Sequence, residues 1–316
     1  MVSERDLLHE LEPEAERLLE RHLGVAEEWF PHDYVPYSLG RDFEGFEGGE
    51  PWTPDQPSLT GVARTALEVN LLTEDNLPSY HREIHGMFGK KDSAWMDWVH
   101  RWTAEEGRHS IVLRDYLVVT RNHDPVALER GRMAVVEEGY DHHARDTLHG
   151  MVYVAFQELA TRISHRNTGR YSDDPVADRI MARIAADENL HMVFYRDMVT
   201  AAMELDPSAT VMAIADEVIG FEMPGAGMPN FRRHSAVIAD AGIYDLRGHH
   251  DDVVWPLLRK WRVFAVEGLD EHAEQRRREL ADFLGKLDGQ ATRFEDKRAV
   301  RHERRARRAA REAANA

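Results

Sequence analysis

Thr103-Ala-Glu-Glu-Gly-Arg-His109 and Ala185-Ala-Asp-Glu-Asn-Leu-His191 are the two stretches that decide the fold of this chain. Each contains a glutamate three residues before a histidine, as the pairs Glu106–His109 and Glu188–His191, and the sequence has no third pair of this kind. Residues three apart lie on one face of a helix, so each pair can direct a carboxylate and an imidazole to the same point. One such match is weak evidence, and the arrangement around the two pairs decides their interpretation.

Each pair has a further glutamate upstream in an apolar neighbourhood. Glu74 lies 32 residues before Glu106, and Glu158 lies 30 residues before Glu188. About 30 residues carries a chain up one helix, through a turn and halfway back, which returns it to the same height. Four antiparallel helices would therefore place four glutamates and two histidines at one level of a bundle.

This donor set is that of the ferritin-like dimetal carboxylate proteins, in which two helices each supply a glutamate and two each supply Glu-x-x-His. Four carboxylates balance the charge of two divalent ions, whereas without metal they would repel one another or take up protons. Carboxylate oxygens combined with two imidazoles suit iron or manganese. The six predicted metal ligands are Glu74, Glu106, His109, Glu158, Glu188 and His191.

Helical periodicity dominates the rest of the chain, and no stretch shows the alternation typical of strands. A helix is expected over residues 5–28, followed by an irregular segment rich in Pro, Gly and aromatic residues at 31–58. Further helices are expected over residues 59–88, 92–121, 125–143, 148–167, 174–205, 208–221, 232–241 and 250–284. The predicted fold is all-α, a ferritin-like four-helix bundle core with additional helices. The chain is expected to divide into an N-terminal helix and strap at residues 1–58, the metal-binding bundle at 59–286 and a basic tail at 287–316.

Composition narrows the chemistry. The 316 residues include no cysteine, which excludes disulfides, thiolate zinc sites and cysteine-bound iron–sulfur clusters. The formal charge of −17 argues against a surface that binds nucleic acid, and no apolar run is long enough to span a membrane. Because the sequence shows no signal peptide, a cytoplasmic location is expected.

The last twenty residues differ from the rest of the chain. They contain eight Lys or Arg and two Glu, a net charge of +6, so the preceding 296 residues carry −23. This tail has almost no large apolar side chain, which predicts either solvated helix or disorder. It is either a frayed end or a guide for an acidic partner.

The motifs resemble those of the soluble acyl-(acyl-carrier-protein) desaturase family over roughly residues 7–284. The two Glu-x-x-His stretches are similar to the two metal motifs of that family, with Gly107 where Asn is common. Leu72-Thr-Glu-Asp-Asn-Leu-Pro-Ser-Tyr80 and Phe156-Gln-Glu-Leu-Ala-Thr161 resemble the segments that supply its other two glutamates. Several motifs in the same order make the resemblance specific.

The resemblance implies a homodimeric bundle with two iron ions (Fe2+) per chain that activate O2. It implies an oxidoreductase of fatty acid biosynthesis, which introduces a cis double bond into an acyl chain held on acyl carrier protein. Electrons would come from ferredoxin, with no nucleic acid or membrane as partner. The six predicted ligands match the iron ligands of the family. Thr161 matches a threonine beside the iron, and Trp29 and Asp187 match an electron path through His109.

Departures from the family pattern concern the substrate. Glu83, Gly86, Met87, Gly150 and Met151 lie where the family lines its acyl channel. An inward charge at Glu83 would shorten or reshape an apolar cavity, so chain length and double-bond position are left open. One alternative is a di-iron enzyme that hydroxylates, N-oxygenates or desaturates a secondary-metabolite intermediate. A ferritin-like iron store and an interaction protein with a vestigial site are further alternatives.

Overall fold

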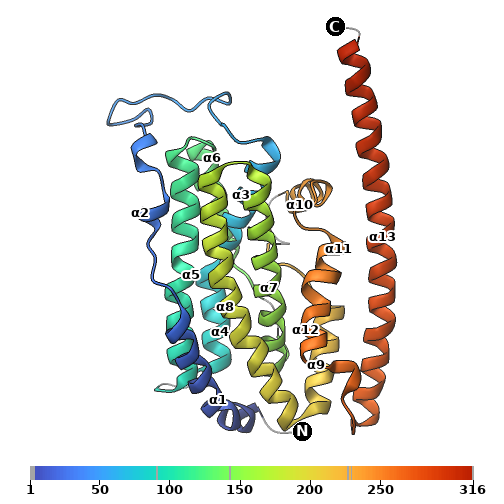
Figure 1. Cartoon of the computed structure of the whole chain (residues 1–316). Helices are drawn as coiled ribbons and strands as arrows, with labels where there is room; N and C mark the ends of the chain where they lie inside the picture. The colour runs from blue at the N-terminus through green and yellow to red at the C-terminus, as the bar shows by residue number, and fades with distance from the viewer. Residues whose placement is uncertain (1–3, 90–91, 142–143, 226–227, 229, 315–316) are drawn as a thin grey trace.

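The computed structural model describes residues 4–89, 92–141, 144–225, 228 and 230–314. Within these residues the chain forms helices joined by loops, and the only extended pairing is an isolated bridge between Phe43 and Glu50. The all-α prediction is therefore confirmed. Figure 1 shows the long helices side by side in one bundle, with the last helix standing along one edge.

The core is built from the four helices that carry the predicted ligands: α3 (Gly61–Glu74), α5 (Ala94–Val119), α7 (Thr147–Ser172) and α8 (Pro175–Leu205). α7 and α8 make the most extensive helix pair and lie at the centre of Figure 1. α7 is buried almost all round over residues 147–161, which is why its sequence lacks a clear polar face. Ser93, Asp146 and Asp174 accept hydrogen bonds from the first backbone N–H groups of α5, α7 and α8 and fix where these helices begin.

The N-terminal segment lies across this core. α1 (Glu4–Val25) packs its apolar side chains against α5 and α8. The irregular segment after it includes two short turns, α2 (Pro31–Tyr34) and a 3-10 turn at Tyr37–Leu39. Arg121, just beyond α5, donates to Gln56 Oε1 and to the Glu50 carbonyl, each at 2.8 Å. The strap is thus held against the bundle by side-chain contacts.

The single helix expected over residues 59–88 is two helices, α3 and α4 (Leu77–Phe88), separated at Asp75 and Asn76. Pro78 explains the break, because in a continuous helix its ring would clash with the carbonyl of residue 74. In the structure Pro78 stands in the first turn of α4, where a missing N–H costs nothing. The break leaves Glu74 as the last residue of α3.

The remaining elements are α6 (Pro125–Glu138), α9 (Pro207–Ile219), α10 (Phe231–Asp240), α11 (Leu246–Gly248), a π turn (His249–Val254), α12 (Trp255–Lys260), a 3-10 turn (Val263–Ala265) and the long α13 (Glu271–Ala314). The prediction of one helix over residues 250–284 is wrong. α12 ends at Lys260, and Arg262 after it takes a left-handed conformation with φ of 53°. α13 starts anew after Asp270, whose carboxylate accepts a hydrogen bond from Ala273 N–H at 2.8 Å.

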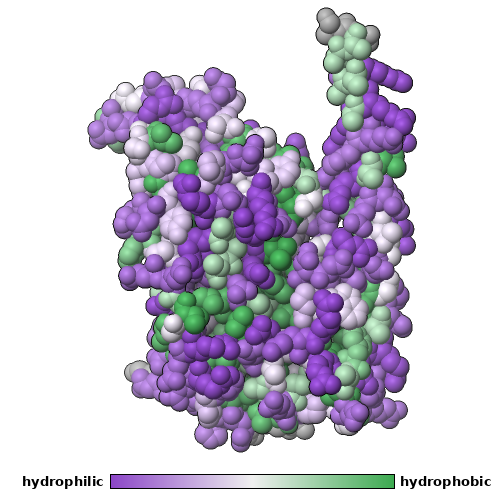
Figure 2. Space-filling model, in the orientation of Figure 1, coloured by the Kyte–Doolittle hydropathy of each residue, from purple (hydrophilic) through white to green (hydrophobic). Residues whose placement is uncertain are grey.

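α13 is one helix of 44 residues. It packs against α9 and α11, and its last turns extend past the body of the molecule as a mainly hydrophilic rod (Figures 1 and 2). Of the two forms expected for the basic tail, helix is the form described as far as Ala314. The boundary at residue 286 falls inside α13, and the division into three segments stays a prediction. None of the helices in the described part of the chain is both long and apolar enough to cross a membrane.

Candidate metal centre

The four core helices bring the six predicted ligands together in the interior. All six are buried, and they come from α3 (Glu74), α5 (Glu106 and His109), α7 (Glu158) and α8 (Glu188 and His191). They form two groups whose ligand atoms lie within 4.8 Å of one another: Glu74, Glu106, His109 and Glu188 in one, and Glu106, Glu158, Glu188 and His191 in the other. Glu106 and Glu188 belong to both groups. The arrangement therefore suits two ions that share these two carboxylates.

Both histidines direct the Nδ1 atom toward the carboxylates. His109 Nδ1 lies 3.3 Å from Glu106 Oε2 and 3.4 Å from Glu188 Oε1. His191 Nδ1 lies 2.8 Å from Glu106 Oε1 and 3.8 Å from Glu158 Oε2. The two imidazoles thus offer the same nitrogen to the space between the carboxylates, which leaves each Nε2 for a different partner.

Unsatisfied atoms show that this space suits metal ions. Glu106 Oε1, Glu158 Oε2, His109 Nδ1 and His191 Nδ1 are buried and have no hydrogen bond of acceptable geometry to any described residue. Buried polar atoms are rarely left in this state, and here they converge. Oxygen and imidazole nitrogen donors in this proportion are those that iron and manganese accept. The residues present fit a pair of such ions.

Asp187 is the outer partner of His109. Its Oδ2 lies 3.4 Å from His109 Nε2 and accepts a hydrogen bond from Trp29 Nε1 at 2.7 Å, while Arg183 donates to Oδ1 at 2.5 Å. Burial alone would raise the pKa of Asp187, but its hydrogen bonds with His109 and Trp29 hold that pKa below the usual range. An ionised Asp187 accepts the Nε2 proton of His109 and so keeps Nδ1 free for a metal. Trp29, Asp187 and His109 are consecutive neighbours, as the predicted electron path requires.

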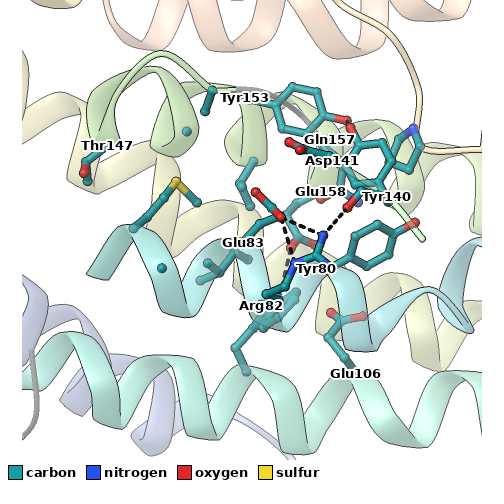
Figure 3. A pocket seen from close by; sticks show the side chains of 18 of the residues that line it. Tyr80, Arg82, Glu83, Glu106, Tyr140, Asp141, Thr147, Tyr153, Gln157 and Glu158 are labelled. Atoms are coloured by element: carbon teal, nitrogen blue, oxygen red, sulfur yellow. Dashed lines mark hydrogen bonds and ion pairs between the residues drawn. The ribbon is translucent and has the colours of Figure 1, made fainter. Parts of the chain in front are cut away.

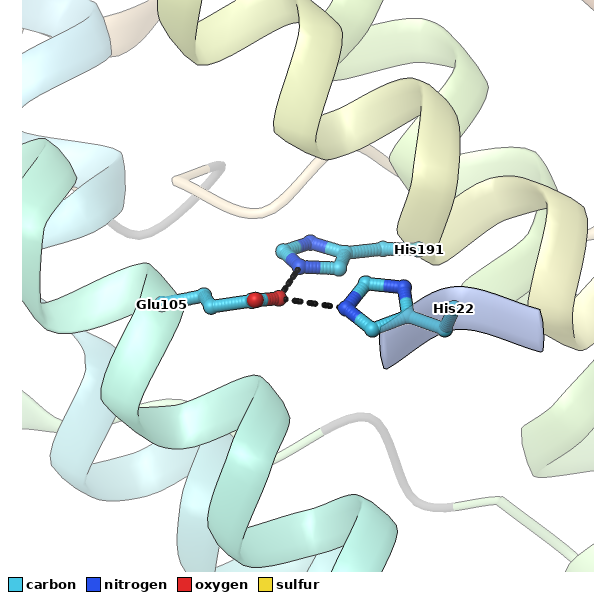
Figure 4. Close-up of side chains that lie close together, drawn as sticks. All are labelled: His22, Glu105 and His191. Carbon is cyan, nitrogen blue, oxygen red and sulfur yellow. Dashed lines mark hydrogen bonds and ion pairs between the residues drawn. The ribbon is translucent and has the colours of Figure 1, made fainter. Parts of the chain in front are cut away.

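Glu105 makes the corresponding contact with His191, as Figure 4 shows. Glu105 Oε2 lies 2.9 Å from His191 Nε2 and also 2.9 Å from His22 Nε2. Burial opposes the charged form, yet the hydrogen bonds with His191 and His22 hold the pKa of Glu105 below its usual range. Sequence reasoning missed both Glu105 and His22. The signal for Glu105 was present, since an acidic residue directly precedes each Glu-x-x-His glutamate; nothing in the sequence connected His22 to it.

His165 is a further buried residue at the centre that the sequence analysis did not single out. Its Nε2 lies 2.8 Å from Glu74 Oε1 and 3.5 Å from Glu188 Oε1. Burial would lower the pKa of His165, but the carboxylates of Glu188 and Glu74 raise it to about 9. His165 follows Glu158 by seven residues, which is two helical turns, and this spacing was the available signal.

Glu158 differs electrostatically from the other carboxylates. Burial and the neighbouring Glu188 raise the pKa of Glu158 well above its usual range. Trp102 Nε1 donates a hydrogen bond to Glu158 Oε1 at 3.1 Å. Thr161, one turn further along α7, donates to Glu188 Oε2 at 3.3 Å. Without metal, the group therefore holds protons that coordination would have to displace.

Two cavities reach this centre, and Thr73, Glu74 and Pro224 line both of them. The first, of about 350 Å3, is bordered by α4 and α7 and includes Glu106 and Glu158 in its wall (Figure 3). The second, of about 440 Å3, is bordered by α3, α7 and α10. The cavities give a small molecule access to the buried groups from two directions.

Comparison with known proteins identifies the family. The family model described as fatty acid desaturase matches residues 3–313. This chain belongs to that family. One relative is DesA1 of Mycobacterium tuberculosis (strain ATCC 25618 / H37Rv), which is provisionally named an acyl-(acyl-carrier-protein) desaturase. It is 50% identical to this chain over 302 residues, and the match covers 93% of this chain and 89% of DesA1. Acyl-(acyl-carrier-protein) desaturase 7, chloroplastic, of Oryza sativa subsp. japonica is 33% identical over 92% of this chain and 76% of its own length.

A solved structure of a related desaturase supports the fold. The X-ray structure of DesA2 from Mycobacterium tuberculosis H37Rv, also provisionally named an acyl-ACP desaturase, matches with a TM-score of 0.70 at 32% identity. The match covers 85% of this chain and 98% of that one. The predicted ferritin-like bundle is confirmed by this likeness.

The first cavity of this desaturase is lined by most of the residues expected at an acyl channel, namely Glu83, Gly86, Met87 and Gly150. Met151 does not line it and packs in the hydrophobic core instead. The Glu83 carboxylate accepts a hydrogen bond from Arg82 at 3.0 Å, and the same guanidinium donates to the Tyr140 carbonyl at 3.2 Å (Figure 3). A paired charge is tolerated beside apolar surface, so the cavity has a polar edge.

We expect the binding of divalent metal to release protons and to strengthen as the pH rises. Burial and Glu188 keep a proton on Glu158, and although burial opposes a charged imidazole, Glu106 raises the pKa of His109 well above its usual value. Both groups must lose a proton to coordinate a metal, so a lower pH favours the metal-free form. Calorimetric titration with Co2+ between about pH 6 and 8 should show affinity that rises with pH, and a heat that depends on the buffer.

Glu188→Ala should bind one or no ion per chain, because Glu188 belongs to both groups. Glu204→Ala is the matched control, since Glu204 is exposed on the same helix, and it should bind as the unmodified chain does. Two ions retained by Glu188→Ala, or an affinity that does not change with pH, would contradict the assignment.

Proposed function

We propose that this chain is an O2- and ferredoxin-dependent di-iron desaturase that introduces a cis double bond into an acyl chain carried on acyl carrier protein. The observation that carries the proposal is the buried pair of overlapping Glu/His groups with a cavity on each side. Family membership supports the reaction class, and the names of the relatives support the carrier-bound substrate. A homodimer and a cytoplasmic location remain predictions.

Two iron ions would be held with Glu106 and Glu188 shared, Glu74 and His109 on one side, and Glu158 and His191 on the other. When bound, such a centre supplies the activation of O2 that an unreactive hydrocarbon chain needs. The overall balance takes two electrons from ferredoxin and two protons, removes one hydrogen from each of two adjacent carbons, and yields two molecules of water. The surrounding helices exclude bulk water and hold the ligands in place through Asp187 and Glu105.

Trp29 and Thr161 serve the supply of electrons and protons in this proposal. Trp29 is joined to His109 through Asp187 by contacts of 2.7 and 3.4 Å, which is a short hydrogen-bonded route from the N-terminal segment to the centre. Thr161 lines the second cavity, and its hydroxyl lies 3.3 Å from Glu188 Oε2 and 3.0 Å from the Glu158 carbonyl. A hydroxyl both donates and accepts, so Thr161 can pass a proton between the cavity and the centre.

The two cavities suggest a path for the acyl chain past Glu74. In the first cavity Met87 lies over Gly150, and a side chain added at Gly150 would collide with Met87 Sδ. Met87 therefore limits how far a chain can extend on this side. The second cavity has Arg232 in its wall, at the surface of the protein. We propose that the carrier stays at the second cavity and that the chain end enters the first.

The charges around α10 support this direction. Arg232 and Arg233 are exposed, and neither has an ion-pair partner among the described residues. Arg233 also lines a groove between α10 and α13, where Arg305 of α13 is paired with Asp240. Arg276 near the other end of α13 is likewise paired, with Asp216 and Glu279. Because acyl carrier proteins are acidic and most of this chain is acidic too, docking needs such a local basic surface.

One observation favours an alternative substrate. The polar edge formed by Arg82 and Glu83 would suit a chain with a polar group, as expected for a di-iron oxygenase or desaturase that acts on a secondary-metabolite intermediate. The reaction outcome identifies an oxygenase, because hydroxylation places an oxygen atom from O2 in the product and desaturation does not. A desaturase of a secondary-metabolite intermediate differs instead in the substrate that it accepts.

The iron-loaded protein, supplied with reduced ferredoxin, O2 and a panel of acyl chains on acyl carrier protein, should form one double bond per chain. Mass spectrometry of reactions in 18O2 should find a loss of two hydrogens and no label in the product. The absence of unsaturation on every chain would refute the proposed reaction. A labelled hydroxyl product would replace it with the alternative.

Met87→Ala should shift the preference toward longer chains, because it removes the side chain that limits the first cavity. Each additional buried methylene is worth about 0.8 kcal/mol, or about four-fold in kcat/KM. Competition between chains that differ by two carbons measures the shift. Met133→Ala, at an exposed methionine of α6, is the control and should change nothing. An unchanged preference in Met87→Ala would contradict the placement of the chain end.

Charge reversal at Arg232 and Arg233 tests the docking surface. We expect the double variant Arg232→Glu with Arg233→Glu to raise KM for the carrier-bound substrate about ten-fold at low salt, with kcat maintained, since rim charges act mainly on encounter. The same chain on free pantetheine should show no change. Arg278→Glu, at an exposed arginine near the start of α13, is the control. Equal effects of both changes would contradict a local docking site.

A further inference from the structure

The two metal-facing histidines are braced crosswise. The acidic residue directly before each shared glutamate reaches the histidine of the other helix: Glu105 of α5 contacts His191 of α8, and Asp187 of α8 contacts His109 of α5. Both contacts are made to Nε2, and both leave Nδ1 facing the carboxylates. The two halves of the centre therefore have the same inner design and differ in what holds Glu105 and Asp187 in turn.

His22 holds Glu105, and it comes from outside the four-helix core. It lies on α1 and is 4% exposed. Its Nε2 is 2.9 Å from Glu105 Oε2, the oxygen that also contacts His191. The ring stands edge-on to Trp98, with centroids 5.1 Å apart. It also stacks on the ring of His191, with centroids 5.9 Å apart and 25° between the ring planes. Figure 4 shows the two imidazoles on either side of the contact with Glu105. These contacts leave the imidazole of His22 little freedom to turn.

The second oxygen of Glu105 has its own donor. Arg101, one turn earlier on α5, donates from Nε to Glu105 Oε1 at 2.6 Å. An ionised carboxylate only accepts hydrogen bonds, so Glu105 receives N–H groups from His22 and His191 on one oxygen and from Arg101 on the other. Because an ionised carboxylate has no proton to donate, its contact with His191 requires a proton on Nε2.

We infer that His22 and Glu105 are positioning residues that hold His191 with its Nδ1 presented to one of the two metal ions. The inference rests on the proposed di-iron function. It assigns α1 a part in the centre: the ion bound by Glu106, Glu158, Glu188 and His191 depends on His22, whereas the ion on the other side depends on Asp187 and Trp29. Loss of His22 should therefore weaken one metal position and leave the other unchanged.

The test is a titration with Co2+, followed by calorimetry and by the visible absorption of the bound ion. The unmodified chain should bind two ions. His22→Leu and Glu105→Gln should each weaken one of them about 10- to 100-fold, the usual effect of removing the partner of a ligand histidine. The double variant should lose no more than either single variant, because both act through His191. His22→Gln can still donate to Glu105 and should restore most of the affinity.

His9→Leu is the matched control, because His9 is an exposed histidine of the same helix, and it should bind as the unmodified chain does. Circular dichroism of each metal-free variant checks the fold. If His22→Leu does not fold, Glu105→Gln, which conserves the size of the side chain, provides the test of the affinity at the His191 position. Tight binding of both ions by Glu105→Gln, or equal weakening of both positions, would overturn the inference while leaving the metal centre in place. Failure of the unmodified chain to bind Co2+ would instead refute the proposed metal centre.

Discussion

The structure depends on the burial of four carboxylates and two imidazoles at one level of a helical bundle. Charged groups in a protein interior are strongly destabilising unless other charges or hydrogen bonds compensate them. Here the compensation is partly internal, through histidines that face the carboxylates, and partly left to the ions that the donor set suits. The apolar surroundings of Glu158 on α7 make this demand severe, and they also keep water away from the centre.

The N-terminal segment completes what the four core helices begin. Trp29 binds Asp187 and His22 binds Glu105, so one short stretch of chain reaches the outer partners of both metal-facing histidines. α1 packs across α5 and α8, the two helices that carry those histidines. A segment that looks peripheral in sequence is thus part of the support of the site. Its two contacts differ in chemistry: an indole N–H donates to Asp187, and a second imidazole contacts Glu105.

The charge distribution and the cavities together support the proposed placement of the carrier protein. Most of the chain is acidic, and the free arginines of α10 lie beside the cavity that reaches the centre from that side. Many other arginines are held in ion pairs and offer no free charge. Arg276 pairs with Asp216, and Arg301 pairs with Asp240. Net charge alone therefore says little about an acidic partner. The position of unpaired charges relative to the cavities says more.

The amino-acid sequence by itself determined the helical class, the family and the six residues that meet at the centre, because ligand spacing and helical periodicity are local properties of the chain. It also contained the signal for the break between α3 and α4, Pro78, although the apolar pattern across residues 59–88 favoured one helix. Only the tertiary structure decided that His22 and His165 lie at the centre, and that Met151 packs in the hydrophobic core instead of lining the first cavity. It also decided that α13 runs unbroken to Ala314. The physical reason is distance along the chain: His22 and Glu105 are 83 residues apart, and a contact across that span follows from how α1 packs on the bundle, which no local pattern records.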